Sequence, residues 1–208
     1  MTMAEIAALL RPFIELEQIQ LGQISIYIDL ILKWNSRVNL TAVRRAEDIV
    51  QRHFGESFFV AAHLLQPQAK VSVIDLGSGA GFPGVPFAIF APQARVTLIE
   101  SNGKKAAFLN EVIRQLKLGN VTVFNQRAEN YDGRTQLVTM RAVEKFSKAV
   151  PFALRLVEPG GHLALMIGSK QVGAAEATDS NPVWGSPVPI PGGHSRVLLV
   201  GTKKVIVG

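Results

Sequence analysis

The sequence contains no cysteine among its 208 residues. Disulfide bonds, zinc sites built on sulfur and thiol nucleophiles are therefore excluded. Long apolar runs are missing too, because no segment reaches the roughly 18 uninterrupted apolar residues that a membrane span requires. The first turns of the chain carry Glu5 within an apolar stretch and Arg11 after it, which is not the order of a secretion signal. From these absences we expect a cytoplasmic protein with no membrane contact and no bound metal.

The composition favours one folded domain with a basic surface. Hydrophobic residues make up 48% of the chain and charged residues 18%, which is enough to bury a sizeable core. The length suits one α/β domain with a modest extension. Lysine and arginine number 22 against 16 acidic residues, a formal net charge of +6. Such a charge favours a polyanionic partner, although many soluble enzymes with small substrates carry it as well.

The N-terminal third of the chain has helical patterning. Apolar residues three or four apart predict an amphipathic helix over 21–34. A second helix is predicted over 46–65, ending before Pro67 because a proline disfavours helix at the residue ahead of it. We therefore divide the chain into a helical extension, residues 1–66, and a main domain, residues 67–208.

In the main domain, short apolar runs alternate with helix-length stretches. The predicted strands are 71–76, 95–100, 121–125, 136–140 and 162–167, with helices over 103–117 and 144–157. Alternation of this kind is typical of a doubly wound, mostly parallel sheet, because parallel neighbours need crossover connections. Four prolines and the pair Gly192-Gly193 indicate a long loop over 171–194. A final edge strand, which can run antiparallel, is predicted over 195–204.

A glycine-rich segment, Asp75 to Gly84, directly follows the first predicted strand and opens a helix. Glycines let the backbone turn tightly and approach a ligand, and a helix N-terminus offers unpaired N–H groups. In an open parallel sheet, the ligand is expected outside the carboxyl ends of the strands. Gly77, Gly79 and Gly81 are therefore candidate residues of a nucleotide-binding site.

Two cofactors compete for this loop. The segment from Gly79 to Gly84 fits the dinucleotide spacing G-x-G-x-x-G, which is a weak signal when taken alone. The longer run from Asp75 to Gly81, D-x-G-x-G-x-G, resembles the first motif of Rossmann-like methyltransferases. A carboxylate just ahead of the loop suits the ammonium and sulfonium of S-adenosylmethionine better than the pyrophosphate of a dinucleotide.

Charged residues also follow the next three predicted strands. Glu100 ends the second strand, where a carboxylate can accept both ribose hydroxyl protons of either cofactor. Glu129 follows the third strand. For both Glu100 and Glu129, the alternative to a ligand-binding role is a solvated position on the surface. Arg141 follows the fourth strand. Its forked donors can hold a carboxylate or a phosphate of a ligand, or they can form a structural ion pair.

Three blocks of the sequence resemble the bacterial RsmG or GidB family, guanine-N7 methyltransferases of small-subunit ribosomal RNA. The blocks are W-N-x-x-x-N-L-T at 34–41 with Arg52-His53 downstream, the loop at 75–84, and Arg127-Ala128-Glu129 with Arg141-Ala142. The glycine-rich block alone points only to a superfamily, whereas the first block joined to it is much more specific. The resemblance extends from about residue 30 to residue 145.

The resemblance implies a Rossmann-like class I methyltransferase fold that binds S-adenosyl-L-methionine. It implies that Gly77 and Phe82 contact the cofactor, that Ala128 and Glu129 lie on its adenine side, and that Arg141 lies at the mouth of the site. The implied substrate is a guanosine in 16S ribosomal RNA or in the small ribosomal subunit, and we expect a monomer. The basic residues expected to hold RNA phosphates near the mouth are Lys104, Arg127, Arg141 and Arg196.

The sequence departs from the family at three places. Members usually show Arg-His-Ile-Leu-Asp-Ser, where this chain has Phe54-Gly55-Glu56 between Arg52-His53 and a serine. Members often have an aspartate before the fourth strand, and this chain has Gln136. Members tend to end the fifth strand with Leu-Lys-Gly, and here Ile167 replaces the lysine. One expected RNA contact is thereby lost, and Lys170 is the nearest substitute for it.

The predicted chemistry needs no general base. Guanine N7 carries an exposed lone pair and no proton at neutral pH, so holding N7 in line with the methyl group and the sulfur supplies most of the catalysis. Methylation at cytosine C5 would call for a cysteine nucleophile, and methylation of an adenine amino group usually comes with a (D/N)-P-P-(Y/F) loop; the sequence has neither. His53 and His162 are expected to be packed or surface residues.

Rival functions fit parts of the same sequence. A methyltransferase for another RNA, a protein or a small molecule would share every cofactor residue. An NAD-dependent oxidoreductase fits the dinucleotide spacing, although the sequence offers no obvious acid for hydride transfer. A non-catalytic RNA-binding module could keep the pocket for structure.

Overall fold

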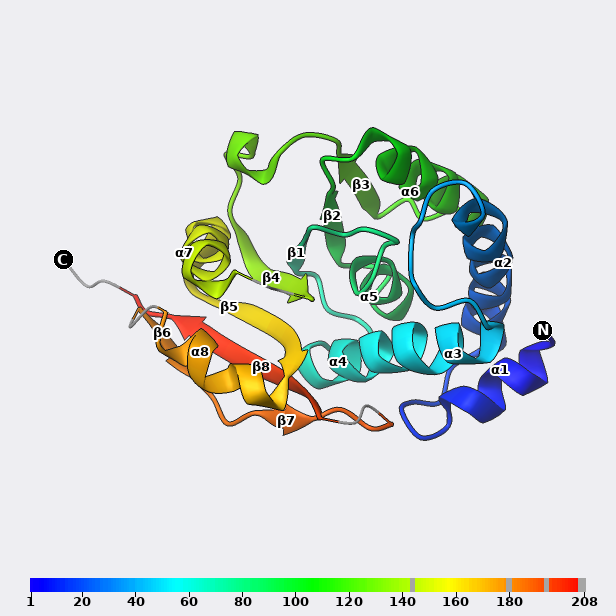
Figure 1. Ribbon diagram of the computed structural model, residues 1–208, viewed down its shortest axis with the longest axis horizontal. Helices are drawn as coiled ribbons and strands as arrows, with labels where there is room; N and C mark the ends of the chain where they lie inside the picture. Colours follow the sequence, from blue (N-terminus) through cyan, green and yellow to red (C-terminus); the bar gives the residue numbers. More distant parts are fainter. Residues whose placement is uncertain (143–144, 179–180, 193–194, 206–208) are drawn as a thin grey trace.

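The computed structural model shows an α/β protein built around one sheet (Figure 1). It describes residues 1–142, 145–178, 181–192 and 195–205. The strands in these ranges are β1 (Ser72–Leu76), β2 (Arg95–Ile99), β3 (Val121–Phe124), β4 (Thr135–Arg141), β5 (Val157–Gly168), β6 (Pro182–Trp184), β7 (Val188–Pro189) and β8 (Arg196–Lys203). Their hydrogen-bonded order is β3-β2-β1-β4-β5-β8-β6, with β7 paired to β8. Neighbours among β1 to β5 are parallel, whereas β8 runs antiparallel to β5, β6 and β7.

The chain changes its direction of winding at β1. It moves outward through α5 (Gly84–Phe90) to β2 and through α6 (Gly103–Leu116) to β3, and then returns to β4 on the other side of β1. Helix α7 (Phe146–Leu156) joins β4 to β5. The prediction of a doubly wound, mostly parallel sheet is confirmed. Such a reversal opens a crevice outside the carboxyl ends of the central strands, where ligands of α/β proteins bind.

Alternate strand residues pack on opposite faces of the sheet, as the pleat requires. Val73 and Leu98 belong to one buried cluster, which also contains residues of α5 and α6. Their chain neighbours Ile74 and Ile99 belong to a second cluster, with residues of α7 and α8 (Val172–Glu176). Because helices cover both faces, the central strands are apolar on both sides.

Helical segments precede the sheet: α1 (Met3–Leu10), α2 (Gln18–Asn35), α3 (Ala46–Ile49), the π-helical η1 (Val50–Gly55) and α4 (Glu56–Leu64). Helix α1 begins with a capping box in which the Thr2 and Glu5 side chains each accept a backbone N–H of the other residue. Helix α2 packs beside α6, and α4 packs beside α5 (Figure 1). The division of the chain at residue 66 stays a prediction, and the residues on either side of it share one hydrophobic core.

The helix predicted over 46–65 is continuous but changes its hydrogen bonding midway. Segments α3, η1 and α4 follow one another without a break and end before Pro67, as predicted. π-Helical stretches are rare in proteins, and those that occur often lie at functional sites. Here it contains Arg52 and His53 and directly precedes Glu56.

The segment after Gly168 contains more secondary structure than the long loop that was predicted there. It forms η3 (Ser169–Gln171), α8, β6 and β7 before β8. Its prolines suggested a loop, but Pro182 and Pro189 lie in strands that pair, within the described residues, with β8 alone, and prolines are tolerated in edge strands. Strand β5 likewise begins at Val157, well before its predicted start. Gly193 and residue 144, where α7 was predicted to begin, lie outside the described residues.

Candidate functional site

A cavity of about 650 Å³ opens at the carboxyl ends of the parallel strands. It is lined by Leu76, Ile99 and Met140, which occupy aligned register positions near the ends of β1, β2 and β4. Residues 126–129, after β3, and the first turns of α7 complete its wall. A volume of this size is usual for cofactor sites, and its position is the one predicted from the strand order.

The glycine-rich loop leaves β1 beside this cavity. Gly77, Gly79 and Gly81 have φ angles of 72°, 58° and 87°, which residues with a Cβ adopt only at a cost. Gly77 lines the cavity, and a Cβ built on it would meet no atom within 4 Å. Gly79 and Gly81 do not line the cavity; they set the path of the turn.

Glu100 directly follows β2 and lines the same cavity. Its side chain is mostly buried, and two backbone groups hold the carboxylate. Gly79 N donates to Oε2 at 2.9 Å, and Asn102 N donates to Oε1 at 2.7 Å. Each oxygen keeps a further lone pair for another donor. Glu100 therefore ties the glycine-rich loop to the end of β2 and can still accept hydrogen bonds from a ligand.

The segment after β3 brings Arg127, Ala128 and Glu129 to the cavity, the last two within the 3₁₀ turn η2 (Ala128–Asn130). The predicted cofactor residues that meet around this one cavity are therefore Gly77, Glu100, Ala128, Glu129 and Arg141.

Asp75 does not line the cavity. Its side chain is buried at the start of α5, where Gly84 N donates to Oδ2 at 3.1 Å and the Thr139 hydroxyl donates to Oδ1 at 3.0 Å. Burial raises the pKa of this carboxyl to about 6, although its hydrogen bonds oppose the shift. The carboxyl group supports the turn into α5. Because Asp75 does not line the cavity, the structure does not support the interpretation that its charge selects the cofactor.

Arg141 reaches from the end of β4 to the start of α4. Its Nη2 donates to Glu56 Oε2 at 3.0 Å and to the Arg52 carbonyl at 2.6 Å. Arg196, from β8, approaches the same Glu56 oxygen with its Nε at 3.2 Å. Burial lowers the pKa of Arg141 to about 10, so the guanidinium stays charged at neutral pH. The structural ion pair considered for Arg141 is present, and the residue also lines the cavity.

His53 is packed inside the protein. Its ring stacks on Phe82 with the centroids 5.0 Å apart, and its Nε2 lies 2.8 Å from the Thr41 hydroxyl. Burial lowers the pKa of His53 to about 3, and Arg141 and other nearby arginines add to the shift. The ring is therefore neutral at physiological pH. His162 is an exposed residue near Thr202, so both histidines lie where packing and surface positions were expected.

Three further predicted site residues lie outside the cavity wall. Phe82 is buried among the aromatic rings of α2 and η1. Lys104 is exposed in the first turn of α6. Arg196 lines, with Arg52, a separate hollow of about 450 Å³. The contacts of these residues with a cofactor or with RNA stay predictions.

The structure adds residues that sequence reasoning missed. Lys145, Lys148 and Phe152 line the cavity from the start of α7. Their spacing of three and four places them on one side of a helix. That spacing was the available signal, but it does not say which side of the helix turns towards the strand ends.

The described residues hold neither a metal-binding cluster nor a membrane-spanning helix. No three histidine or acidic side chains within 1–142, 145–178, 181–192 and 195–205 converge as a metal site would require. No helix in these ranges is both long and apolar enough to cross a membrane.

Comparison with known proteins gives a consistent match. The family model GidB, rRNA small subunit methyltransferase G, matches residues 20–185. The ribosomal RNA small subunit methyltransferase G of Roseiflexus sp. (strain RS-1) is 39% identical over 203 residues, covering 91% of this chain and 86% of that protein. The protein of the same name from Xanthomonas euvesicatoria pv. vesicatoria (strain 85-10) is 37% identical over 182 residues, covering 86% and 84%.

Solved structures share the fold at low identity. The ribosomal protein L11 methylase from Lactobacillus delbrueckii subsp. bulgaricus gives a TM-score of 0.63 at 11% identity, over 74% of this chain and 80% of that one. P. horikoshii TYW2 in complex with MeSAdo gives 0.58 at 18% identity, over 73% and 63%. The fold is the Rossmann-like class I methyltransferase fold predicted from the sequence.

Proposed function

The chain belongs to the GidB family of rRNA small subunit methyltransferase G, and we propose that it transfers a methyl group from S-adenosyl-L-methionine to N7 of a guanosine in 16S ribosomal RNA. The single observation that carries the proposal is the family match over residues 20–185. This range includes the W-N-x-x-x-N-L-T block, the π-helical segment and every residue that lines the cavity.

The cavity suits the proposed cofactor by its size and its donor set. When bound there, S-adenosyl-L-methionine would supply an electrophilic methyl group on a sulfonium. Gly77 would let ligand atoms approach the backbone, because no side chain occupies the space above it. Glu100 would accept hydrogen bonds from the ribose hydroxyl groups on its remaining lone pairs. Ala128 and Glu129 would contact the adenine, the first through apolar surface and the second by accepting a hydrogen bond from the amino group.

The chain's own residues then have to orient the guanosine and exclude competing nucleophiles. N7 has no proton to lose, so no side chain needs to act as a base during the transfer. The described cavity wall contains no histidine, and the nearby His53 is buried and neutral. Arg141, which lines the cavity and is held by Glu56, would fix the position of the target nucleotide.

Basic side chains around the cavity support a polyanionic substrate. Arg127, Lys145 and Lys148 line it and are exposed. Exposed lysine and arginine side chains pair with phosphates and set the register of a nucleic acid, while contacts to the base select the nucleotide. Lys104 and Arg196 would extend this contact beyond the cavity wall.

A methyltransferase for another RNA, a protein or a small molecule is the remaining alternative. It would use the same cofactor residues, and the family match favours ribosomal RNA over it. An oxidoreductase or a non-catalytic module receives no support from the relatives, whose names all describe methyl transfer.

The proposal is tested by transfer of a tritiated methyl group. Small ribosomal subunits isolated from cells that lack their own N7 methyl mark are incubated with the protein and labelled S-adenosyl-L-methionine. We expect incorporation into 16S RNA and a single 7-methylguanosine by mass mapping. Subunits that already carry the mark form the matched control and should take up no label. Transfer to protein, transfer to another base or no transfer would each overturn the proposal.

We also propose that the protein acts as a monomer in the cytoplasm. Ribosomal RNA, the substrate named for the relatives, supports this location. Sedimentation of the purified protein would test the monomer.

A further inference from the structure

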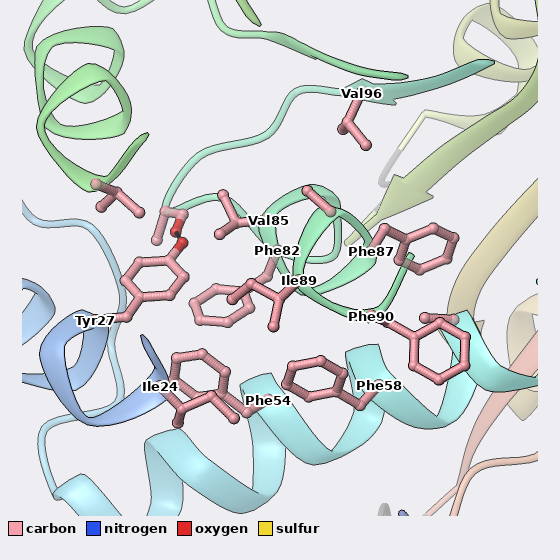
Figure 2. Packing of buried hydrophobic residues seen from close by; sticks show 14 of the residues in the cluster. Ile24, Tyr27, Phe54, Phe58, Phe82, Val85, Phe87, Ile89, Phe90 and Val96 are labelled. Carbon is pink, nitrogen blue, oxygen red and sulfur yellow. Dashed lines mark hydrogen bonds between the residues drawn. The ribbon is translucent and has the colours of Figure 1, made fainter. Parts of the chain in front are cut away.

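Tyr27 is a fully buried side chain of α2 that reaches the glycine-rich loop of the main domain. Figure 2 shows it beside Phe82, with Phe54 and Ile24 below and α5 alongside. Tyr27 therefore connects the N-terminal helices with the segment that runs from β1 into α5.

The Tyr27 hydroxyl donates a hydrogen bond to the backbone carbonyl of Ala80, in the middle of the loop. Both residues are buried, so water does not compete for this bond. Burial also raises the pKa of Tyr27 well above its usual value, which keeps the hydroxyl protonated and able to donate.

The next two loop residues pack directly on Tyr27. A Cβ added to Gly81 would collide with the Tyr27 hydroxyl oxygen, so the absence of a side chain at Gly81 makes room for the hydrogen bond. The ring of Phe82 stacks on the Tyr27 ring, with the centroids 5.4 Å apart and an interplanar angle of 8°. One side chain thus contacts three consecutive loop residues.

The other end of the loop is tied to the cavity. Gly79 N donates to Glu100 Oε2, and Glu100 lines the cavity together with Gly77. The backbone between Gly77 and Gly81 is therefore held between Glu100 on the cavity side and Tyr27 on the core side. A shift at Ala80 would move Gly79 and with it a hydrogen bond that orients the Glu100 carboxylate.

From this arrangement we infer that Tyr27 is a positioning residue for the cofactor: it fixes the glycine-rich loop in the shape that S-adenosyl-L-methionine binds. The inference rests on the proposed function, because it concerns the same cavity. It gives the N-terminal helices a role in cofactor binding, although none of their residues lines the cavity.

The test is Tyr27→Phe, which removes one oxygen and keeps the stacked ring, so the variant is expected to fold. Calorimetry with S-adenosyl-L-methionine should show about tenfold weaker binding, the effect of losing roughly one buried hydrogen bond. KM for the cofactor should rise in parallel, while kcat at saturating cofactor and the affinity for RNA stay unchanged. Hydrogen exchange should accelerate at the Gly79 and Gly81 amides.

Ile24→Val is the matched control, because it removes one buried methylene from the same helix, one turn away, in the same core. It should lower the melting temperature and leave cofactor affinity unchanged. Wild-type affinity in Tyr27→Phe, or an equal loss of affinity in both variants, would overturn the inference. Failure of the wild-type protein to bind S-adenosyl-L-methionine would instead overturn the proposed function, so the two failures are distinguishable.

Discussion

Asp75 and Glu100 lie near the ends of adjacent strands and are both mostly buried, yet their carboxyl groups serve different purposes. Asp75 is paired inside the protein with Gly84 N and the Thr139 hydroxyl, and burial raises its pKa to about 6. Glu100 is held by backbone N–H groups beside the cavity. Their positions along the strands, rather than their residue types, decide which one can meet a ligand: Asp75 lies within β1 opposite Leu98, whereas Glu100 follows the last residue of β2.

Gly77→Val should abolish binding of S-adenosyl-L-methionine while leaving the protein folded. The φ angle of 72° costs a β-branched residue about 1–2 kcal/mol, and the new side chain would occupy open space at the cavity wall. Calorimetry measures the binding and circular dichroism the fold. Gly173→Val, in open surroundings on α8 and away from the cavity, is the control and should bind normally. Unchanged affinity in Gly77→Val would contradict the placement of the cofactor.

At the scale of elements, the π-helical segment η1 packs against the connection between α1 and α2. Gly55 ends this segment. A Cβ on Gly55 would approach ring carbons of Phe13 to 2.7 Å. The missing side chain at Gly55 therefore leaves the space in which Phe13 packs, and the next residue, Glu56, is directed to Arg141 and Arg196.

Gly55→Ala should have opposite effects on stability in the presence and in the absence of the Phe13 ring, which a double-mutant cycle measures. Gly55→Ala in the wild-type protein should lower the free energy of unfolding, because Phe13 has to move. The same change in a Phe13→Ala background should raise it by about 0.5–1 kcal/mol, the usual gain from replacing a helical glycine. Urea denaturation measures both differences. If Gly55→Ala changed the free energy of unfolding in the same direction in both backgrounds, the packing of Phe13 would not depend on the absence of a side chain at Gly55.

At the scale of the whole molecule, the net charge of +6 points to a binding surface once the positions of the basic side chains are known. Arg127, Lys145 and Lys148 are exposed at the cavity that holds the predicted cofactor residues. Phosphates of an RNA bound there would displace counterions, and affinity would then depend on salt. The cofactor is a small molecule that displaces few ions, so its affinity should change little with salt.

Binding of 16S RNA should therefore weaken steeply between low and physiological salt. The Lys145→Gln, Lys148→Gln double variant should reduce the slope of log affinity against log salt by about one for each phosphate contact that is lost. Filter binding over a salt series measures this slope. Lys33→Gln combined with Lys70→Gln removes the same charge from exposed positions outside the cavity wall and should leave the slope nearly unchanged. Equal slopes in the two double variants would place the RNA elsewhere.

Much of the site could be predicted because it depends on local sequence. Gly77 and Glu100 follow directly from strands whose apolar runs are unmistakable, and the carboxyl ends of parallel strands meet at one edge. The prediction was weaker where proline and glycine obscured the strand pattern, as at the start of β5 and in β6 and β7. Lys145 and Lys148 were missed because the rotation of α7 about its axis is set by packing against the sheet.

By itself, the sequence determined the α/β class, the doubly wound order, the glycine-rich turn and the family, because each depends on residue type and spacing along the chain. Only the tertiary structure decided that Asp75 faces the core, that Glu56 pairs with both Arg141 and Arg196, and that Tyr27 holds the carbonyl of Ala80. Those partners lie tens of residues apart in the chain. Their meeting depends on how helices pack on the sheet, which no local pattern encodes.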